Sequence, residues 1–279
     1  MDGFILINKE IGETSNNVVQ KVKKALKAKK VGHLGTLDPI AEGLLILAIN
    51  KATKFSSYFL ESDKSYEVKV ELGKSTDTDD SSGKIIFESN VELPEKIIRE
   101  SLFSFIGESE QIPPFFSALK HQGKPLYKYA REGQFIMKPA RKILIKEIND
   151  YKYSNKVCSF TVYCTKGTYI RSLARDLGEK LKCGAHMTAL KRIRQHNFKL
   201  SDAVNILEIS KEKIVPIETA FNNFKKIIIN SEDSKKFING VKNIYNDNPD
   251  NLYKISNNEG IFLGIGQIKN KNLRHKQLV

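Results

Sequence analysis

The chain has 279 residues, of which 40% are hydrophobic, so it can bury a large core and form one large domain plus a small one. The 46 Lys and Arg residues exceed the 32 Asp and Glu residues, and the formal net charge of +14 favours a polyanionic partner, nucleic acid first. A general bias towards lysine is the alternative explanation of this charge. No apolar run is long enough to span a bilayer, and residues 1–9 lack the order of a signal peptide, so we expect a cytoplasmic protein.

The three cysteines indicate neither a disulfide nor a metal site. Cys158 and Cys164 fall on one predicted strand, where six residues separate them by roughly 20 Å, too far for a disulfide. Cys183 stands alone, no Cys-x-x-Cys pair occurs, and the five histidines are scattered. We therefore expect no bound metal.

The N-terminal pattern predicts a short strand followed by a basic helix. Residues 4–8 have the pattern of a strand, and Thr14 or Ser15 can cap a helix over about residues 16–29. This helix has an apolar face for the core and carries a row of lysines on its other face. The lysine face is either a solvated surface or a contact for a phosphate backbone.

A short glycine-containing stretch places one carboxylate just before the apolar run of residues 44–49. Asp38 precedes Pro39, which disfavours a helical backbone at the aspartate and predicts an extended or turn conformation. Gly32 and Gly35 permit tight turns and close approach of a ligand to the backbone. The apolar run itself is either a buried strand or a segment of a core helix. Asp38 is thus either a turn former or a reacting group on a loop anchored to the core.

A strictly alternating strand is predicted over residues 66–72, after a helical segment over residues 51–60. Tyr66 shares the apolar face of this strand. It is either a core tyrosine or a residue that presents its hydroxyl to a pocket. The acidic loop of residues 76–83 lacks the glycine and the glutamate that an EF-hand loop requires, so a calcium site is not indicated.

The middle of the chain has an unusual composition. Pro94 introduces a predicted amphipathic helix over about residues 95–106. Residues 111–133 then interleave aromatic side chains with Lys, His and Arg in a loop and a short helix. Aromatic rings stack on bases and cations hold phosphates, so this composition suits single-stranded or loop RNA. An ordinary loop with a few anchoring aromatics is the alternative.

An arginine stands at an unexpected position after the next two strands. These strands are predicted near residues 141–152 and 156–165, and Thr168 is a plausible N-cap of the helix that follows. Arg171 falls in the first turn of this helix, where the helix dipole disfavours a cation. We interpret it as the partner of a specific anion, which is a structural carboxylate, a phosphate or Asp38.

Composition changes after about Phe221, and the rest of the chain is predicted to form a small β-rich module. Residues 227–229 have the pattern of a strand, and a short helix ends at Asn239-Gly240. Residues 257–260 have the composition of a hairpin turn between two strands.

Several of these stretches together resemble the TruB-type tRNA pseudouridine synthases along nearly the whole chain. The most specific stretch is residues 32–45, which looks like the catalytic motif of the family. The others follow in the order of the family: residues 63–66, 76–83, 111–114, 117–120, 127–133 and 166–171. The tail is similar, more loosely, to the PUA-like module that ends these enzymes.

The resemblance implies an α+β fold with a mixed, largely antiparallel central sheet, the pseudouridine synthase catalytic fold, flanked by helices. It implies a catalytic domain at residues 1–220 and a small β-rich PUA-like RNA-binding module at residues 221–279. The implied reaction is isomerisation of uridine to pseudouridine at position 55 in the T loop of tRNA, with no cofactor and no metal. The implied partner is the tRNA T stem-loop, and we expect no membrane contact, no obligate protein partner and a monomer.

The resemblance also implies roles for individual residues. Asp38 would be the catalytic nucleophile, either attacking the ribose C1′ or assisting a glycal route. Arg171 would keep Asp38 ionised and oriented, and Tyr66 would stack on the target base with its hydroxyl placed for proton transfer. The uridine must leave the loop stack, and His33 would fill the vacated space. Further RNA contacts are implied for Lys9, Lys64, Asp80, Lys120, Tyr127, Arg131 and Lys166.

Three positions depart from the family pattern. Lys9-Glu10 stands where the family usually has Lys-Pro, residues 192–196 lack a common glycine, and residues 273–279 lack the usual proline. A non-catalytic RNA-binding or tRNA-folding protein on the same scaffold is the main alternative function, but binding alone would not require Asp38, Tyr66 and Arg171 together. A synthase acting on rRNA or inside a guide-RNA assembly is a second alternative.

Overall fold

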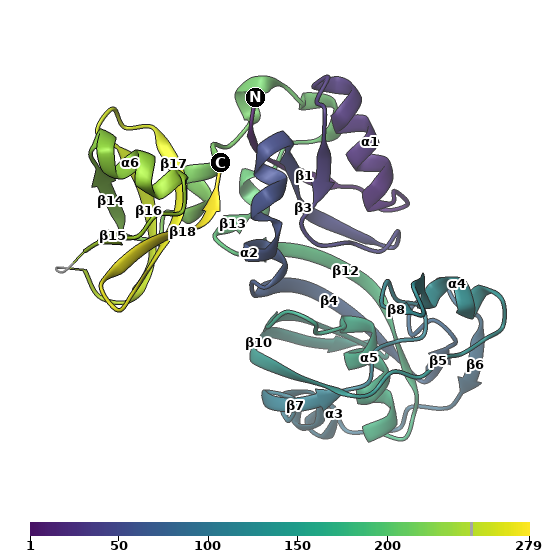
Figure 1. Cartoon of the computed structure of the whole chain (residues 1–279). Helices are drawn as coiled ribbons and strands as arrows, with labels where there is room; N and C mark the ends of the chain where they lie inside the picture. The colour runs from purple at the N-terminus through teal and green to yellow at the C-terminus, as the bar shows by residue number, and fades with distance from the viewer. Residues whose placement is uncertain (246–247) are drawn as a thin grey trace.

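The computed structural model describes residues 1–245 and 248–279. It contains a large mixed sheet with helices on its faces and a smaller sheet at the C-terminal end (Figure 1). The large sheet has the strand order β1 (Gly3–Lys9), β3 (Ala41–Ile49), β12 (Ala185–Gln195), β4 (Lys64–Leu72), β11 (Val157–Cys164), β10 (Arg141–Ser154) and β7 (Gly107–Gln111). The pair β12–β3 is parallel, whereas β12–β4 and the other neighbours along this path are antiparallel.

Short elements extend this sheet or project from it. β2 (Val31–His33) pairs with β3, and β13 (Phe198–Lys199) pairs with β12. Two small hairpins are formed by β5 (Lys74–Thr76) with β6 (Ile85–Glu88), and by β8 (Lys120–His121) with β9 (Lys124–Pro125). α4 (Leu126–Arg131) follows the second hairpin, and three short 3-10 helices follow β13: η2 (Leu200–Asp202), η3 (Ile206–Glu208) and η4 (Lys211–Lys213).

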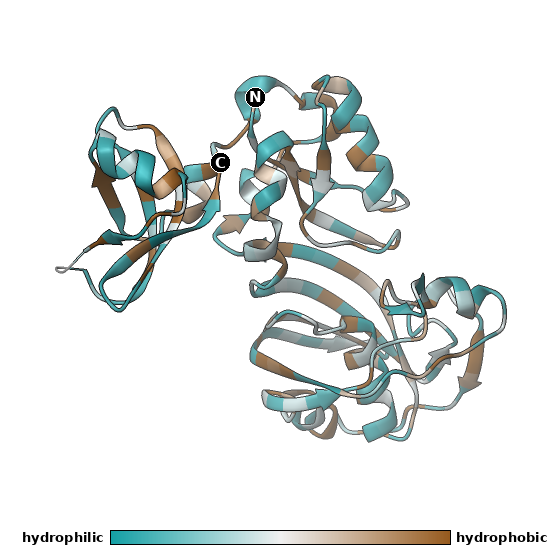
Figure 2. Cartoon of the chain, in the orientation of Figure 1, coloured by the Kyte–Doolittle hydropathy of each residue, from teal (hydrophilic) through white to brown (hydrophobic). Residues whose placement is uncertain are grey.

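One face of the large sheet carries the main hydrophobic core. α1 (Ser15–Ala25), α3 (Glu95–Phe103) and α5 (Ile170–Lys180) contribute their apolar residues to it. The strands supply the other half, because every second side chain of a strand points to the same face. On β4 these residues are Tyr66, Val68, Val70 and Leu72. Figure 2 shows the pattern as brown bands interrupted by teal along β4 and β12.

The opposite face of β1 and β3 packs against a layer of aromatic rings. η1 (Asn50–Phe55), α2 (Ser56–Leu60) and η5 (Ile217–Phe221) bring these rings together with those of the strands. Phe4 and Phe59, for example, have ring centroids 4.7 Å apart. Ile265 of the C-terminal sheet belongs to the same cluster, so the two sheets share a hydrophobic contact.

The C-terminal sheet has its own small core. Its strand order is β14 (Lys226–Ile229), β16 (Asn251–Asn257), β17 (Phe262–Lys269), β18 (Asn272–Leu278) and β15 (Asn243–Ile244). α6 (Ser231–Ile238) covers it through the buried Phe237. Residues 257–260 connect β16 to β17, which confirms the predicted hairpin. Phe221 lies in the aromatic cluster just before this sheet begins at Lys226.

Most predicted strands are confirmed, including those at residues 4–8, 66–72, 141–152 and 156–165. The apolar run of residues 44–49 is part of strand β3 and is not a core helix segment.

The segment predicted to be helical over residues 51–60 ends at Leu60, and α6 ends at Ile238 with Asn239 as its C-cap, both as predicted, but two other predicted helices end earlier than expected. The helix predicted over residues 16–29 ends at Ala25, because Lys27 has a left-handed backbone with φ of +48°. The helix predicted over residues 95–106 ends at Phe103, shortly before Gly107, whose φ of +114° favours glycine. The N-cap prediction at the third helix was wrong. Tyr169 is the N-cap residue of α5, and the Thr168 hydroxyl donates instead to the Thr165 carbonyl at 3.0 Å.

β12 is a central strand that the sequence analysis missed. It places His186, Arg192 and Gln195 in buried positions, so it lacks the simple apolar alternation of a half-buried strand. Register shifts on β12 also interrupt the period of two against β4, at Met187/Ala189 and at Arg192/Arg194.

Candidate active site

A pocket of about 320 Å³ opens on the helix-bearing face of the large sheet. Asp38 enters it from the loop between β2 and β3, Tyr66 from β4, and Arg171 from the first turn of α5. The structure thus brings the predicted catalytic residues to one place, although they are far apart in the sequence. The rest of the pocket lining is made of residues 35–37, Leu60, Lys64, residues 117–118, Thr165, residues 167–170, Leu190 and Arg192.

Asp38 is held at the pocket by its backbone and by one ion pair. Its carbonyl accepts the Ala41 N–H at 3.0 Å, which makes a turn around Pro39, as the proline predicts. Its side chain is 38% exposed, and Oδ2 lies 3.0 Å from Nη2 of Arg171. Asp38 is therefore reachable from solvent and already paired with a guanidinium.

Arg171 is a tightly held cation of the pocket, with a side chain only 7% exposed. Besides Asp38, it donates to the carbonyl of Thr78 at 3.1 Å and to the carbonyl of Phe116 at 2.8 Å. Its Nε lies 3.6 Å from Oδ2 of Asp80. The planar fork is thus filled on all sides, and this explains why an arginine is tolerated in the first turn of α5.

Asp80 is a correction to the predicted RNA contacts. It is 4% exposed, so it cannot offer a carboxylate to RNA at the surface. One oxygen accepts the Thr78 hydroxyl at 2.8 Å and the Ser82 N–H at 2.9 Å, and the other faces Arg171. Asp80 therefore supports Arg171 from the side opposite Asp38.

Tyr66 lies at the floor of the pocket and is 8% exposed. It is the cross-strand partner of Arg192 in the β4–β12 pairing. Burial raises the pKa of Tyr66 to about 12, although the Arg192 guanidinium acts in the opposite direction. The hydroxyl therefore carries its proton at neutral pH.

Lys9 and Lys64, both predicted to contact RNA, have different surroundings. Lys9 is buried, and its ammonium donates to the carbonyls of Glu10 and Glu13 at 2.9 and 2.7 Å, so the predicted surface contact is corrected to an internal one. Lys64 lines the pocket, and its ammonium donates to the Ser62 carbonyl at 2.7 Å. Burial lowers the pKa of each lysine to about 8.

The remaining predicted RNA contacts lie outside the lining of the pocket. Lys120, Arg131 and Lys166 are exposed, and Tyr127 is half-buried beneath the Arg131 guanidinium, whose carbon lies 5.5 Å from the ring centroid. His33 is half-buried on β2 and is not among the residues that line the pocket. Burial lowers the pKa of His33 below its ordinary value, and the charge of Arg192 adds to this effect.

Arg192 is the pocket residue that the sequence analysis missed. It is 1% exposed and donates to three backbone carbonyls, including that of Gly35 at 2.9 Å. The one signal for it was the basic pair Lys191-Arg192 between apolar residues, which becomes informative only once this segment is known to be a strand.

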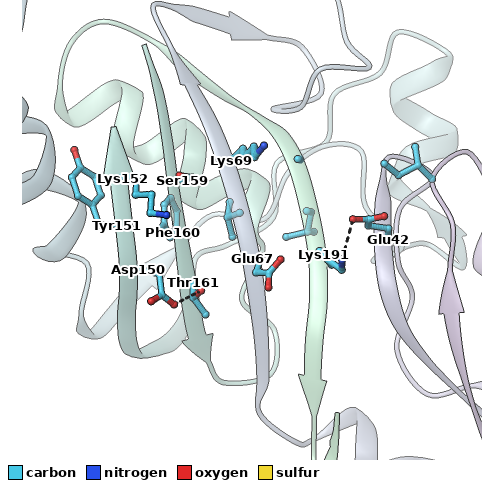
Figure 3. A pocket seen from close by; sticks show the side chains of 14 residues that line it. Glu42, Glu67, Lys69, Asp150, Tyr151, Lys152, Ser159, Phe160, Thr161 and Lys191 are labelled. Atoms are coloured by element: carbon cyan, nitrogen blue, oxygen red, sulfur yellow. Dashed lines mark hydrogen bonds and ion pairs between the residues drawn. The ribbon is translucent and has the colours of Figure 1, made fainter. Parts of the chain in front are cut away.

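A larger groove of about 660 Å³ lies on the opposite face of the sheet (Figure 3). Its lining contains equal numbers of acidic residues and lysines: Glu42, Glu67, Asp150, Lys69, Lys152 and Lys191. Lys191 lies 3.7 Å from Glu42, and the Thr161 hydroxyl donates to Asp150 at 3.0 Å. Balanced pairs of exposed side chains are a usual way to solvate a sheet face, so the smaller pocket is the better candidate for chemistry.

Comparison with known proteins assigns the chain to a family. The family model described as TruB family pseudouridylate synthase (N terminal domain) matches residues 23–170, and the one described as tRNA pseudouridylate synthase B C-terminal domain matches residues 171–229. The tRNA pseudouridine synthase B of Wigglesworthia glossinidia brevipalpis is 43% identical, and the alignment covers 95% of this chain and 86% of that protein. The chain belongs to the TruB family of pseudouridylate synthases. A second member, the tRNA pseudouridine synthase B of Clostridium perfringens strain 13, is 41% identical over 100% of this chain and 99% of that protein.

Solved structures share the fold of this TruB family member. A Cbf5–Nop10–Gar1 complex contains a chain with a TM-score of 0.75 and 24% identity, covering 99% of this chain and 84% of that one. An H/ACA RNP bound to a substrate RNA containing 2′-deoxyuridine contains one with a TM-score of 0.73 and 22% identity, with the same coverage. The predicted α+β fold with a mixed central sheet is therefore confirmed.

Two departures from the TruB family pattern have a visible structural setting. Glu10 is exposed beside the buried Lys9, so the glutamate is accommodated without entering the core. His196 replaces the usual glycine and has φ of +57°, a conformation that glycine adopts without strain. The ring of His196 packs on Phe59, with centroids 5.1 Å apart, which offsets part of that strain.

Within residues 1–245 and 248–279, no cluster of three or more His, Cys, Asp or Glu side chains has the arrangement of a metal site. The three cysteines are buried and unbridged. No helix in the same residues is long and apolar enough to cross a membrane.

Proposed function

We propose that this protein converts uridine to pseudouridine at position 55 in the T loop of tRNA, with Asp38 as the nucleophile. The observation that carries the proposal is the pair between Asp38 and Arg171, 3.0 Å apart in a pocket of a TruB family chain. The names of the relatives from Wigglesworthia and Clostridium support tRNA as the substrate.

The reaction is an internal rearrangement of the nucleoside. The bond between N1 and C1′ breaks, the base turns, and a bond between C5 and C1′ forms, with the C5 proton lost and N1 protonated. No atom or electron is gained or lost overall. The Asp38 carboxylate either adds to C1′ and leaves again, or assists a glycal route at the ribose.

The neighbours of Asp38 prepare it for this role. Arg171 orients the carboxylate through Nη2, and Asp80 holds the other side of the same guanidinium. Tyr66, a neutral phenol at the pocket floor, stacks on the base and is placed for proton transfer. The uridine must flip out of its stack to reach the pocket, and His33 on the nearby β2 fills the space that it leaves.

The surroundings of the pocket suit an RNA backbone. Lys64 lines the pocket, and Lys120, Tyr127, Arg131 and Lys166, which lie outside its lining, offer the RNA further cations and an aromatic ring. The catalytic domain is residues 1–220, and residues 221–279 form a PUA-like module that adds RNA contacts. A basic hollow on that module supports its role, with Lys242, Lys269, Arg274 and Lys276 in its lining. The protein acts on tRNA as a monomer, without an obligate protein partner.

The test is incubation with an unmodified tRNA transcript, followed by mapping of pseudouridine at single-nucleotide resolution. A transcript with cytidine at position 55 is the matched control. We expect product at position 55 of the first transcript and none in the second. Tight binding of both transcripts without product would favour the non-catalytic RNA-binding alternative, and product at another uridine would remove the T-loop assignment.

A further inference from the structure

The loop that carries Asp38 is gripped by side chains at the end of β12. Nε2 of Gln195 donates to the carbonyl of Leu34 at 2.5 Å. Nη2 of Arg192 donates to the carbonyl of Gly35 at 2.9 Å, and Nη1 donates to that of Thr36 at 3.5 Å. Three successive carbonyls of the loop are thus bound by two side chains of one strand.

These carbonyls need donors from outside the loop. Gly35 has φ of +139°, a conformation that breaks the strand ladder, so the loop lacks a neighbouring strand to satisfy its backbone. A β-carbon at Gly35 would lie 3.3 Å from Nε2 of Gln195 and 3.4 Å from Nη1 of Arg192. The loop therefore rests directly on the two side chains.

Arg192 is anchored so that its fork has one orientation. Its Nε donates to the carbonyl of Leu44 at 2.7 Å, which fixes the guanidinium against β3. Within the described parts of the chain, it forms no salt bridge with a carboxylate. Its donors are thus committed to backbone carbonyls and to the side chain of Tyr66. The single ammonium nitrogen of a lysine cannot take the places of the three separate nitrogens of this guanidinium.

The far end of the same loop is held from the other side. The Leu37 N–H donates to the Ser15 hydroxyl at 2.9 Å, and that hydroxyl donates back to the Leu37 carbonyl at 3.0 Å. Asp38 follows at once and pairs with Arg171. Residues 34–38 are therefore each bound by a side chain from another element.

We propose that Arg192 and Gln195 are positioning residues that set the place of Asp38 relative to Arg171. They act through the backbone of residues 34–36 and do not touch the reacting atoms of Asp38. This inference rests on the proposed role of Asp38 as the nucleophile. Displacement of a reacting group by about 1 Å can cost about 100-fold in rate, so a loosened loop has a measurable effect.

The test compares single-turnover pseudouridine formation at saturating tRNA in Arg192→Lys, Gln195→Met and the wild type. We expect the rate constant to fall about 10- to 100-fold in Arg192→Lys and less than about tenfold in Gln195→Met, which frees one carbonyl of the loop. The tRNA dissociation constant and the fraction of molecules that react should stay near wild type. Amide hydrogen exchange of residues 34–38 should become faster in both variants.

The matched control is Lys191→Gln, the neighbouring position on β12, whose side chain lies on the opposite face beside Glu42. Its rate constant and its hydrogen exchange should not change. If Arg192→Lys and Gln195→Met both keep rate constants within about twofold of the wild type, or lose only the reactive fraction or the tRNA affinity, the positioning role is wrong. Failure of the wild type to modify tRNA would instead refute the proposed function, so the two failures are distinguishable.

Discussion

The two hollows on opposite faces of the large sheet differ in how their charges are balanced. The outer groove, the one on the face that lacks Asp38, is the larger, and its acids and lysines are equal in number and include the pair of Glu42 with Lys191. The inner pocket, the one that Asp38 enters, is smaller. The guanidinium of Arg171 is buried there between Asp38 and Asp80. Volume therefore does not identify the site. We infer the candidate site instead from a buried cation that links an exposed carboxylate to a buried one, because water screens such charges less than those of the groove.

The largest contrast should come from removing one carboxylate in each hollow. Asp38→Asn should lower single-turnover pseudouridine formation by about 10⁴-fold or more, because an amide neither adds to C1′ nor carries the charge of a carboxylate. Binding of tRNA should persist. Asp150→Asn in the outer groove should leave the rate unchanged. Persistent turnover in Asp38→Asn, or an equal loss of rate in both variants, would show that the two faces do not differ in catalysis.

A change of cation should also separate the two faces. Arg171→Lys should lower the rate constant about 100-fold, because the single nitrogen of a lysine cannot take the places of the two guanidinium nitrogens that contact Asp38, Thr78 and Phe116. Lys69→Arg in the outer groove, the reverse exchange, should have no effect on the rate. Single-turnover kinetics measure both. A near-wild-type rate in Arg171→Lys would show that charge alone, without the fork geometry, supports Asp38.

A smaller effect is expected from a change at Asp80, the buried carboxylate that faces Arg171. Asp80→Asn should lower the rate constant about tenfold and leave tRNA affinity nearly unchanged, because Asp80 acts through Arg171 and is buried away from RNA. Glu67→Gln is the control in the outer groove. A loss of affinity without a loss of rate would restore the predicted RNA contact of Asp80 and contradict its internal role.

The smallest effect concerns pH and Lys64. Burial lowers the pKa of Lys64 to about 8, so the ammonium loses its proton as pH rises from 7 to 9. If the charged form contacts RNA, the tRNA dissociation constant should rise with pH, by up to about tenfold between pH 7 and pH 9. Lys64→Arg keeps its charge throughout and should give a flat profile. Filter binding at constant ionic strength measures both, and a flat wild-type profile would exclude Lys64 from RNA contact.

Much of the fold followed from local patterns. The alternation over residues 66–72 identified β4 and the face of Tyr66, and residues 44–49 supplied the core of β3. Element ends were less accurate, because a single left-handed residue such as Lys27 stops a helix without a compositional signal. β12 was not predicted, because its buried polar residues and its bulges interrupt the regular alternation of a strand.

The candidate site was likewise predictable from local sequence only in part. Residues 32–45 identified Asp38 by their resemblance to a family motif, and the cation in the first turn of α5 indicated that Arg171 has an anionic partner. The choice of Asp38 over a phosphate, and the addition of Asp80, needed the tertiary structure, which brings Arg171 to two carboxylates far away in the sequence. Tertiary packing likewise decided the burial of Lys9 and Asp80, and the hydrogen bonds from Arg192 to the loop that carries Asp38. Local sequence carries backbone preference and periodicity, whereas the partner of a buried charge is set by which distant segments the core brings together.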